Sequence, residues 1–110
     1  MEWSAVEDEL EKLIAANRDF SEATIKNAKD LLVYVSENCV IGDGVDRGYW
    51  PTINFHWLNA RPMPVSVEVF DDHYEFYIFT SDLFEVYEYG CNPGEALPDE
   101  FKMRLKRIAL

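Results

Sequence analysis

The sequence predicts an α+β fold, a single domain over residues 1–110 in which an N-terminal helical hairpin and a C-terminal helix flank a four-stranded antiparallel meander (ααββββα). Three observations support this prediction. Apolar residues recur at helical spacing over the first 38 residues and again near the end of the chain. Between them, four short runs alternate β-branched or aromatic residues with polar ones, as half-buried strands do. The connections are short, which favours antiparallel neighbours, and 48% hydrophobic residues are enough for one core.

The first helix is expected at Ser4–Ala16. Ser4 and Glu7 have the spacing of a capping box, in which each side chain bonds the backbone N–H of the other residue. The buried stripe of this helix is predicted to contain Val6, Leu10, Leu13 and Ile14, extended by Trp3.

The second helix is expected to begin at Ser21 and to end near Asn38. Phe20 and Ile25 are spaced for a hydrophobic staple across its start. Its apolar face is predicted to consist of Ile25, Ala28, Leu31, Leu32 and Val35. Because the connection between the two helices is short, they should form an antiparallel hairpin.

An irregular loop is expected from Cys39 to Pro51. The segment Gly42–Gly48 contains three glycines in seven residues, which favours a flexible loop. Tyr49 and Trp50 follow it and could fold back over an apolar surface.

The four strands are expected at Thr52–Leu58, Val65–Phe70, Tyr74–Thr80 and Leu83–Tyr89. The segment Asn59–Pro64, with two prolines, connects the first two strands, and Gly90–Gly94 breaks the sheet after the last. A final helix is expected to begin at Pro98, a favourable first helical residue, and to bury Phe101, Leu105 and Ile108.

The two faces of the meander can be assigned if Asp71 and Asp72 form a two-residue turn. Phe70 then pairs with His73, and Glu68 pairs with Glu75. The core face receives Val65, Val67, Val69, Tyr74, Phe76 and Ile78. The second face receives Ser66, Glu68, Phe70, Glu75, Tyr77 and Phe79, with Asn54 and His56 from the first strand and Glu85, Tyr87 and Tyr89 from the last.

This second face has features that favour a binding surface. Glu68 opposite Glu75 costs up to about 1 kcal/mol, and large aromatic side chains lie beside the two carboxylates. Such a surface would pair with Arg or Lys of a partner. The predicted partner-binding residues are Glu68, Phe70, Asp71, Asp72, Glu75, Tyr77, Phe79, Glu85 and Tyr87. Two alternatives remain: the last helix or the long loop covers this face, or a one-residue slip of the strands inverts the two faces.

The chain is strongly acidic, with a net charge of −11 at pH 7. Between Ile41 and Leu97, ten carboxylates are accompanied by only two cations, Arg47 and Arg61, which gives a local net charge of −8. Such a protein repels phosphates, so we expect no direct binding to nucleic acid or to a membrane, and instead electrostatic steering toward a basic protein partner.

The sequence favours a cytoplasmic location. No apolar run approaches the ~20 residues needed to span a bilayer, and the N-terminal residues lack the basic and apolar regions of a secretory signal. Cys39 and Cys91 form no C-x-x-C pair and are expected to be reduced.

Few residues in the sequence suggest catalysis or metal binding. His56 and His73 are the only histidines, and the sequence beside His73 offers only Asp71 and Asp72 as further ligands. Cys39 with His56 has no local support as a nucleophilic pair, and neither a glycine-rich phosphate loop nor a G-x-S-x-G motif is present. We therefore expect no cofactor, no metal ion and no enzymatic activity.

The runs Pro51-Thr52-Ile53, Phe55-His56-Trp57 and Val65–Val69, followed by Tyr74, form an acidic strand pattern that resembles small immunity or antitoxin-like proteins encoded beside bacterial toxins. In size and charge the chain is also similar to acidic phage inhibitors of CRISPR complexes, the anti-CRISPR proteins. Both resemblances imply a non-catalytic inhibitor that occludes a cationic toxin, nuclease or nucleic-acid-binding complex. The alternatives are a small enzyme or ligand-binding domain with a pocket between helices and sheet, and a scaffold or homodimer that self-associates through the aromatic face.

Overall fold

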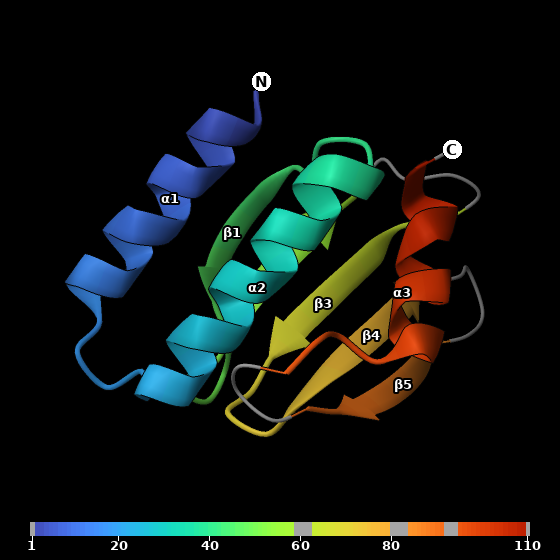
Figure 1. The fold of residues 1–110 in the computed structure, drawn as a ribbon. Helices are drawn as coiled ribbons and strands as arrows, with labels where there is room; N and C mark the ends of the chain where they lie inside the picture. Colours follow the sequence, from blue (N-terminus) through green and yellow to red (C-terminus); the bar gives the residue numbers. More distant parts are fainter. Residues whose placement is uncertain (1, 59–62, 80–83, 92–94, 110) are drawn as a thin grey trace.

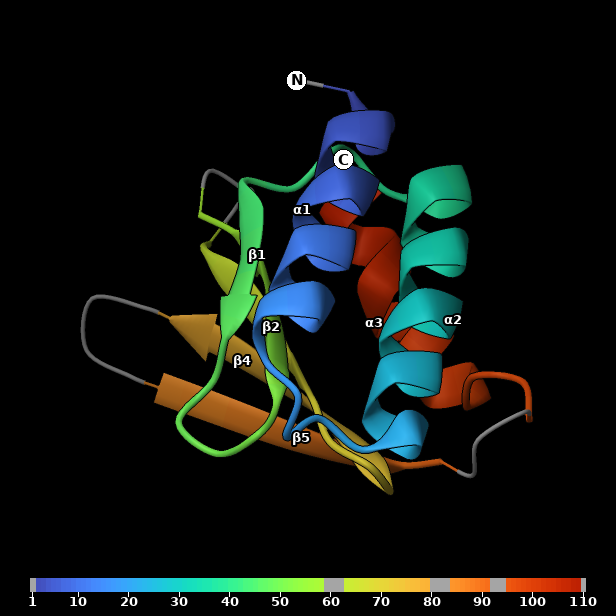
Figure 2. The ribbon, with the colours of Figure 1, turned by 90° about the vertical axis from the view of Figure 1, so that its left-hand side faces the viewer.

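All three described helices lie on one face of an antiparallel sheet. The computed structural model describes residues 2–58, 63–79, 84–91 and 95–109. Over these residues, five strands pair in the order β1-β2-β3-β4-β5, each antiparallel to the next. Figures 1 and 2 show the helices together on one side of this sheet, which leaves the opposite side without a covering helix.

The helices are α1 (Trp3–Ala16), α2 (Glu22–Asn38) and α3 (Asp99–Lys106), the last continued by a 3₁₀ turn, η1 (Arg107–Ala109). The strands are β1 (Gly44–Arg47), β2 (Ile53–Trp57), β3 (Val65–Val69), β4 (His73–Phe79) and β5 (Phe84–Gly90). The predicted α+β class is confirmed. The predicted order ααββββα is wrong in one respect, because the described residues form five strands between α2 and α3 rather than four.

The additional strand is β1, which lies in the glycine-rich segment that was expected to be a loop. Gly44 pairs with His56, and Arg47 pairs with Ile53. The guanidinium group of Arg47 also forms two hydrogen bonds of 2.6 Å with the carboxylate of Asp19, in the connection between α1 and α2. These long-range contacts outweigh the low strand propensity of glycine, on which the loop prediction depended.

The helix starts agree only in part with their predicted caps. In the described residues, α1 begins at Trp3 after an N-cap residue, Glu2, whose side chain makes no capping bond. The capping box predicted at Ser4 is therefore wrong. The start of α2 is confirmed, because the Oγ of Ser21 accepts a 3.0 Å hydrogen bond from the N–H of Thr24.

Some predictions fall wholly or partly outside the described residues. The first four residues of the predicted connection Asn59–Pro64 lie outside, as do residues 92–94 of the predicted break. Thr80, the predicted end of one strand, and Leu83, the predicted start of the next, also lie outside. The predicted start of the last helix is displaced by one residue, because Pro98 is the N-cap of α3 rather than its first helical residue.

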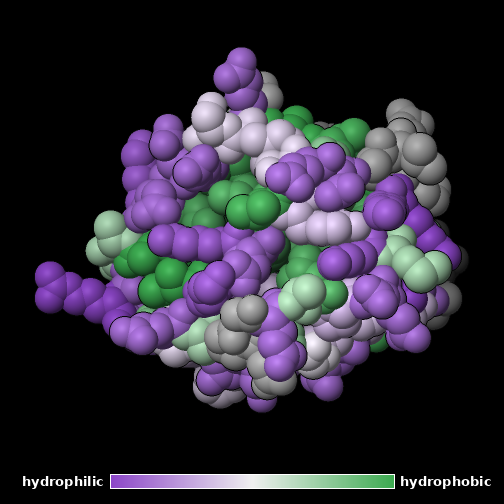
Figure 3. Space-filling model, viewed as in Figure 1, coloured by the Kyte–Doolittle hydropathy of each residue, from purple (hydrophilic) through white to green (hydrophobic). Residues whose placement is uncertain are grey.

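A hydrophobic core fills the space between the helices and the sheet. Its largest fully buried side chains are Trp57, Tyr74, Phe55, Phe101, Leu10, Leu31, Ile53, Leu105, Val6, Val35, Val67 and Val69. From the side of the helices, hydrophilic residues cover most of the surface, and hydrophobic residues show between α1 and α2 (Figure 3). None of the helices in the described residues is long and apolar enough to cross a membrane.

Candidate functional site

The turn between β3 and β4 determines which side chains reach the face of the sheet opposite the helices, which we call the open face. The N–H of Phe70 donates to the carbonyl of His73 at 2.9 Å, which confirms the predicted turn at Asp71-Asp72. Beyond the turn, Glu68 pairs with Glu75, also as predicted. Because side chains alternate along a strand, this register directs both glutamates to the open face.

Helix α2 holds this turn in place. The side-chain amide of Asn27 is buried and donates to the carbonyl oxygens of Phe70 at 3.0 Å and Asp71 at 3.1 Å. The backbone carbonyl of Asn27 accepts a 3.0 Å hydrogen bond from the hydroxyl of Tyr74. Because buried polar groups need partners, these three bonds fix the turn against the helix and thereby fix the register of β3 and β4.

One row of acidic and amide side chains crosses the five described strands on the open face. The register aligns Asp46, Asn54, Glu68, Glu75 and Glu88, one from each strand, and we call them the acidic row. The glutamates of β3 and β4 were predicted to lie on this face. Asp46 was not predicted here because its segment was expected to be a loop. Glu88 was not predicted because the two faces of the last strand were assigned the wrong way round.

Glu85, Tyr87 and Tyr89 therefore do not lie on the open face, and the prediction of Glu85 and Tyr87 as partner-binding residues there is corrected. Tyr87 pairs with Phe76, whose side chain is in the core, so these three side chains point toward the helices. Arg104 of α3 accounts for this orientation. Its guanidinium carbon lies 3.6 Å from the ring centroid of Tyr87, and its Nε donates to the hydroxyl of Tyr89 at 2.6 Å.

The hydroxyl of Tyr77 lies between the two central glutamates. It is 2.8 Å from Oε1 of Glu68, and it also contacts the carboxylate of Glu75. Burial and these two carboxylates raise the pKa of Tyr77, so the hydroxyl keeps its proton at neutral pH. A hydroxyl has one proton to donate, so it serves one carboxylate at a time. A cationic side chain with several donors would serve both.

Gly48 allows the connection between β1 and β2 to close against the acidic row. A Cβ atom at this position would lie 2.0 Å from Oγ1 of Thr52 and 2.6 Å from Oε2 of Glu68. Those two atoms form a 2.5 Å hydrogen bond with each other, in which Thr52 is the donor. A residue without a side chain is therefore required where the backbone passes this bond.

His73 lies at the turn end of the open face, next to two members of the acidic row. Its Nε2 is 3.5 Å from Glu75 and 3.4 Å from Glu88, its Nδ1 is 2.5 Å from Asp72, and the ring of Phe70 stacks on it at 4.0 Å between centroids. Burial of the ring lowers the pKa of His73. The bond to Asp72 and its charge, the charge of Glu88 and the contact with Glu75 outweigh this effect and raise the pKa above its ordinary value.

The same side chains offer donor atoms that suit a divalent metal ion. One atom each from His73, Glu75 and Glu88 lies within 4.8 Å of the others. The bond between Asp72 and the second ring nitrogen is the kind that orients a metal-binding histidine. A proton and a metal ion compete for Nε2, and the raised pKa of His73 favours the proton. This group could not be predicted from the sequence beside His73, because Glu88 comes from the neighbouring strand.

Next to the acidic row, the open face presents a group of aromatic residues, two of them exposed. Tyr77, Phe79 and Phe84, which we call the aromatic cluster, are stacked or tilted against one another, with Phe84 5.5 Å from Tyr77 and 5.6 Å from Phe79 between ring centroids. Phe79 is 38% and Phe84 is 59% exposed, and Val86 beside them is 44% exposed. Large apolar side chains next to carboxylates are typical anchors of protein interfaces.

A serine, a histidine and an aspartate also meet on the open face. Oγ of Ser66 lies 2.7 Å from Nδ1 of His56, and Oδ2 of Asp46 lies 2.9 Å from Nε2. Ser66 is buried, with only 6% of its surface exposed. It also lies in the central strand β3, whose backbone N–H groups bond to both neighbouring strands and so cannot stabilise an oxyanion. We interpret this group as a network that orients His56.

Cys39 lies on the other side of the sheet from His56, among the helices. Its Sγ donates a 3.2 Å hydrogen bond to the carbonyl of Leu105. Burial raises the pKa of the Cys39 thiol to about 11, so it is protonated at neutral pH. The structure does not bring the two residues together as a nucleophilic pair.

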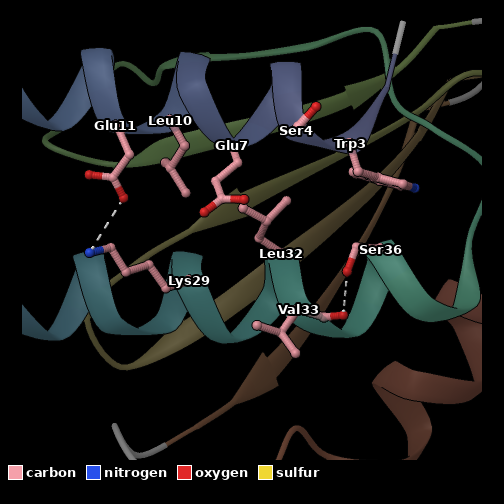
Figure 4. A pocket seen from close by; sticks show the side chains of 9 residues that line it. All are labelled: Trp3, Ser4, Glu7, Leu10, Glu11, Lys29, Leu32, Val33 and Ser36. Atoms are coloured by element: carbon pink, nitrogen blue, oxygen red, sulfur yellow. Dashed lines mark hydrogen bonds and ion pairs between the residues drawn. The ribbon is translucent and has the colours of Figure 1, made fainter.

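A surface hollow of about 450 Å³ lies between α1 and α2 (Figure 4). Leu10 and Leu32 line it, and Lys29 forms a 3.6 Å ion pair with Glu11 at one end. The ligand-binding alternative predicted a pocket between the helices and the sheet, whereas this hollow lies between two helices. Neither histidine nor cysteine is among the described residues that line it.

Charge is unevenly distributed between the two sides of the molecule. The described lysines and arginines lie in the helical layer and its connections, with the exception of Arg47 in β1. The side chain of Arg47 also points to the helical side, where it binds Asp19 and lies over the ring of Phe20 at 5.3 Å. Within the described residues, the open face therefore contains carboxylates and two histidines but neither lysine nor arginine.

Comparison of this chain with protein-family models, with curated proteins and with solved structures gave no match. The functional interpretation therefore depends on the geometry of the open face.

Proposed function

We propose that this protein is a non-catalytic binding protein whose open face docks on a basic surface of a protein partner and inhibits the partner by occluding that surface. The observation that supports this most is the acidic row. Glu68, Glu75 and Glu88 face one another on adjacent strands, on a face without described lysine or arginine. Like charges that face each other across strands lower the stability of a sheet, and a local loss of stability is typical of a functional site.

The chemistry of the open face specifies the chemistry of the partner. Arginine or lysine side chains would form charge-assisted hydrogen bonds with the glutamates of the acidic row. An arginine would also stack on the rings of the aromatic cluster. Toxins, nucleases and other proteins that bind nucleic acid use such basic side chains to contact phosphates. A protein that covers those side chains would block nucleic-acid binding, and a net charge of −11 would accelerate the encounter.

The test compares two variants of equal charge. Glu75→Gln with Glu88→Gln neutralises two carboxylates of the acidic row and keeps their size. Glu7→Gln with Glu37→Gln neutralises two exposed carboxylates of the helices and is the matched control. Each immobilised protein is exposed to a lysate at low ionic strength, and bound proteins are released at high ionic strength. Released proteins are identified, and the affinity of each for the three baits is measured.

We expect a basic protein that binds the wild type and the helix control equally and binds the open-face variant about tenfold or more weakly. Inhibition of that protein's nucleic-acid binding by the wild type and by the helix control, but not by the open-face variant, would support occlusion. Equal retention of every basic protein by the two variants would show that the excess negative charge of the whole chain, and not the open face, is responsible.

A further inference from the structure

The two edges of the sheet differ in how far the chain covers them. Strand β1 is four residues long and packs beside α1 (Figure 2). The carboxylate of Glu9 in α1 accepts a 3.3 Å hydrogen bond from the N–H of Val45, so an outward amide of β1 already has a partner. A short, covered edge of this kind resists the addition of a further strand.

The opposite edge, β5, is seven residues long and mostly exposed. The N–H of Cys91 donates to the carbonyl of Asp72 at 3.0 Å, which sets the hydrogen-bonding phase between β5 and β4. Because bonded and non-bonded pairs alternate in an antiparallel ladder, the next residues bonded to β4 are Tyr89, Tyr87 and Glu85. The backbone N–H and C=O groups that point away from the sheet are those of Phe84, Val86, Glu88 and Gly90. No hydrogen bond from another described residue reaches these groups.

We propose that the basic partner adds an edge strand to β5, so that the sheet of this protein continues into the partner. This inference rests on the proposed function and specifies how the partner is held. Main-chain hydrogen bonds to the outward groups of β5 would align the added strand. Every second side chain of that strand would then lie on the open face, beside Phe84, Val86 and Glu88.

Charge favours a basic strand over a second copy of this chain. Two β5 strands side by side would bring Glu85 and Glu88 of both copies into one two-stranded ribbon, with Glu75 of each copy next to it. Each copy also has a net charge of −11, so the two chains repel each other. A strand with Lys or Arg near Glu88 and apolar residues near Phe84 and Val86 complements this edge in both charge and hydropathy.

Val86 offers a substitution that separates strand addition from other kinds of docking. Its N–H points outward, because Val86 forms a non-bonded pair with Tyr77. Val86→Pro removes that donor and no hydrogen bond to β4, and proline is tolerated on the outward side of an edge strand. Val86→Ala also loses the valine side chain but keeps the N–H, so it is the matched control.

The probes are two capped octapeptides of equal charge, one in which lysine alternates with valine and one in which lysine alternates with proline. The prolines remove the N–H groups that an added strand needs. Amide hydrogen exchange of the whole protein is measured by NMR with each peptide at saturation. With the Lys–Val peptide, exchange at Phe84, Val86, Glu88 and Gly90 should slow about tenfold or more, whereas Glu85, Tyr87 and Tyr89 should change little because β4 already protects them.

Val86→Ala should show the same protection as the wild type, and Val86→Pro should lose it at Phe84 and Glu88. Equal protection by both peptides, or protection confined to the helices, would overturn strand addition. Protection without peptide that increases with protein concentration would assign the edge to a second copy.

If both peptides shift the resonances of Glu68 and Glu75 and neither protects β5, strand addition fails and the proposed function stands. If neither peptide shifts those resonances, the proposed function fails as well.

Discussion

Replacing Tyr77 with phenylalanine should destabilise the protein by about 2 kcal/mol at neutral pH. The hydroxyl of Tyr77 contacts the carboxylates of both Glu68 and Glu75. A hydrogen bond to a charged acceptor contributes about 1.5–3 kcal/mol, and we take the lower end because this hydroxyl is only half-buried. Without it, the two carboxylates face each other directly, which adds a few tenths of a kcal/mol. The total corresponds to a decrease in Tm of about 8 °C for a domain of this size.

The assay is urea unfolding of the wild type and Tyr77→Phe at pH 7. Tyr87→Phe is the matched control, because the hydroxyl of Tyr87 donates to one exposed carboxylate, Glu85, at 3.0 Å. It should cost less than about 0.5 kcal/mol. In a background that carries both Glu68→Gln and Glu75→Gln, Tyr77→Phe should cost about half as much as in the wild type, since a hydrogen bond to a neutral acceptor contributes only about 1 kcal/mol. Equal costs for the two phenylalanine variants, or no change in the Gln background, would refute the assigned role of Tyr77.

Three further predictions concern the residues that hold the site in place. The raised pKa of His73 stabilises the fold below the unfolded pKa of about 6.5, and this contribution is lost as pH rises through the folded pKa. His73→Gln should therefore lower the free energy of unfolding at a pH of about 5.5 and change it little at about 9, and an equal loss at both would contradict the ion pairs with Asp72 and its neighbours. Gly48→Ala should cost about 1–3 kcal/mol in urea unfolding because its Cβ would displace Thr52, and an unchanged midpoint would show that the connection moves freely. Ser21→Ala should cost about 1 kcal/mol through loss of the N-cap of α2, whereas a thermal melt identical to the wild type would remove that role.

The register of β3 and β4 could be predicted from the sequence because only one of their faces is aliphatic. Val65, Val67 and Val69 alternate with polar residues, and the Asp71-Asp72 turn leaves one pairing that places Tyr74 with the valines. A slip of one residue, which the sequence left open, would have buried Glu68. The Phe70–His73 hydrogen bond and the pairing of Glu68 with Glu75 exclude it.

Which side chains of β5 face the core could not be predicted in this way, because both faces of the strand contain large side chains. Phe84 and Val86 alternate with Tyr87 and Tyr89, and polarity suggested that the tyrosines point to solvent. Arg104 of α3 lies over the ring of Tyr87 and donates to the hydroxyl of Tyr89. These are tertiary contacts that the sequence pattern does not contain.

The remaining parts of the site depend on contacts between distant residues. β1 was missed because its stability comes from pairing with β2 and from the contact of Arg47 with Asp19. The group around His73 was missed because Glu88 reaches it only through the β4–β5 register. Local sequence could therefore identify the acidic and aromatic character of the open face, but not the row that crosses it.

The most direct test of the account is to map the carboxylates that a bound basic partner protects from chemical modification. Carbodiimide labelling followed by mass spectrometry measures the reactivity of each carboxylate in the free protein and in the complex. We expect Asp46, Glu75 and Glu88 to lose reactivity on binding, while Glu7 and Glu37 on the helices keep theirs. Protection of Glu7 and Glu37, with Glu75 and Glu88 still reactive, would show that the partner binds the helical side and would contradict the account.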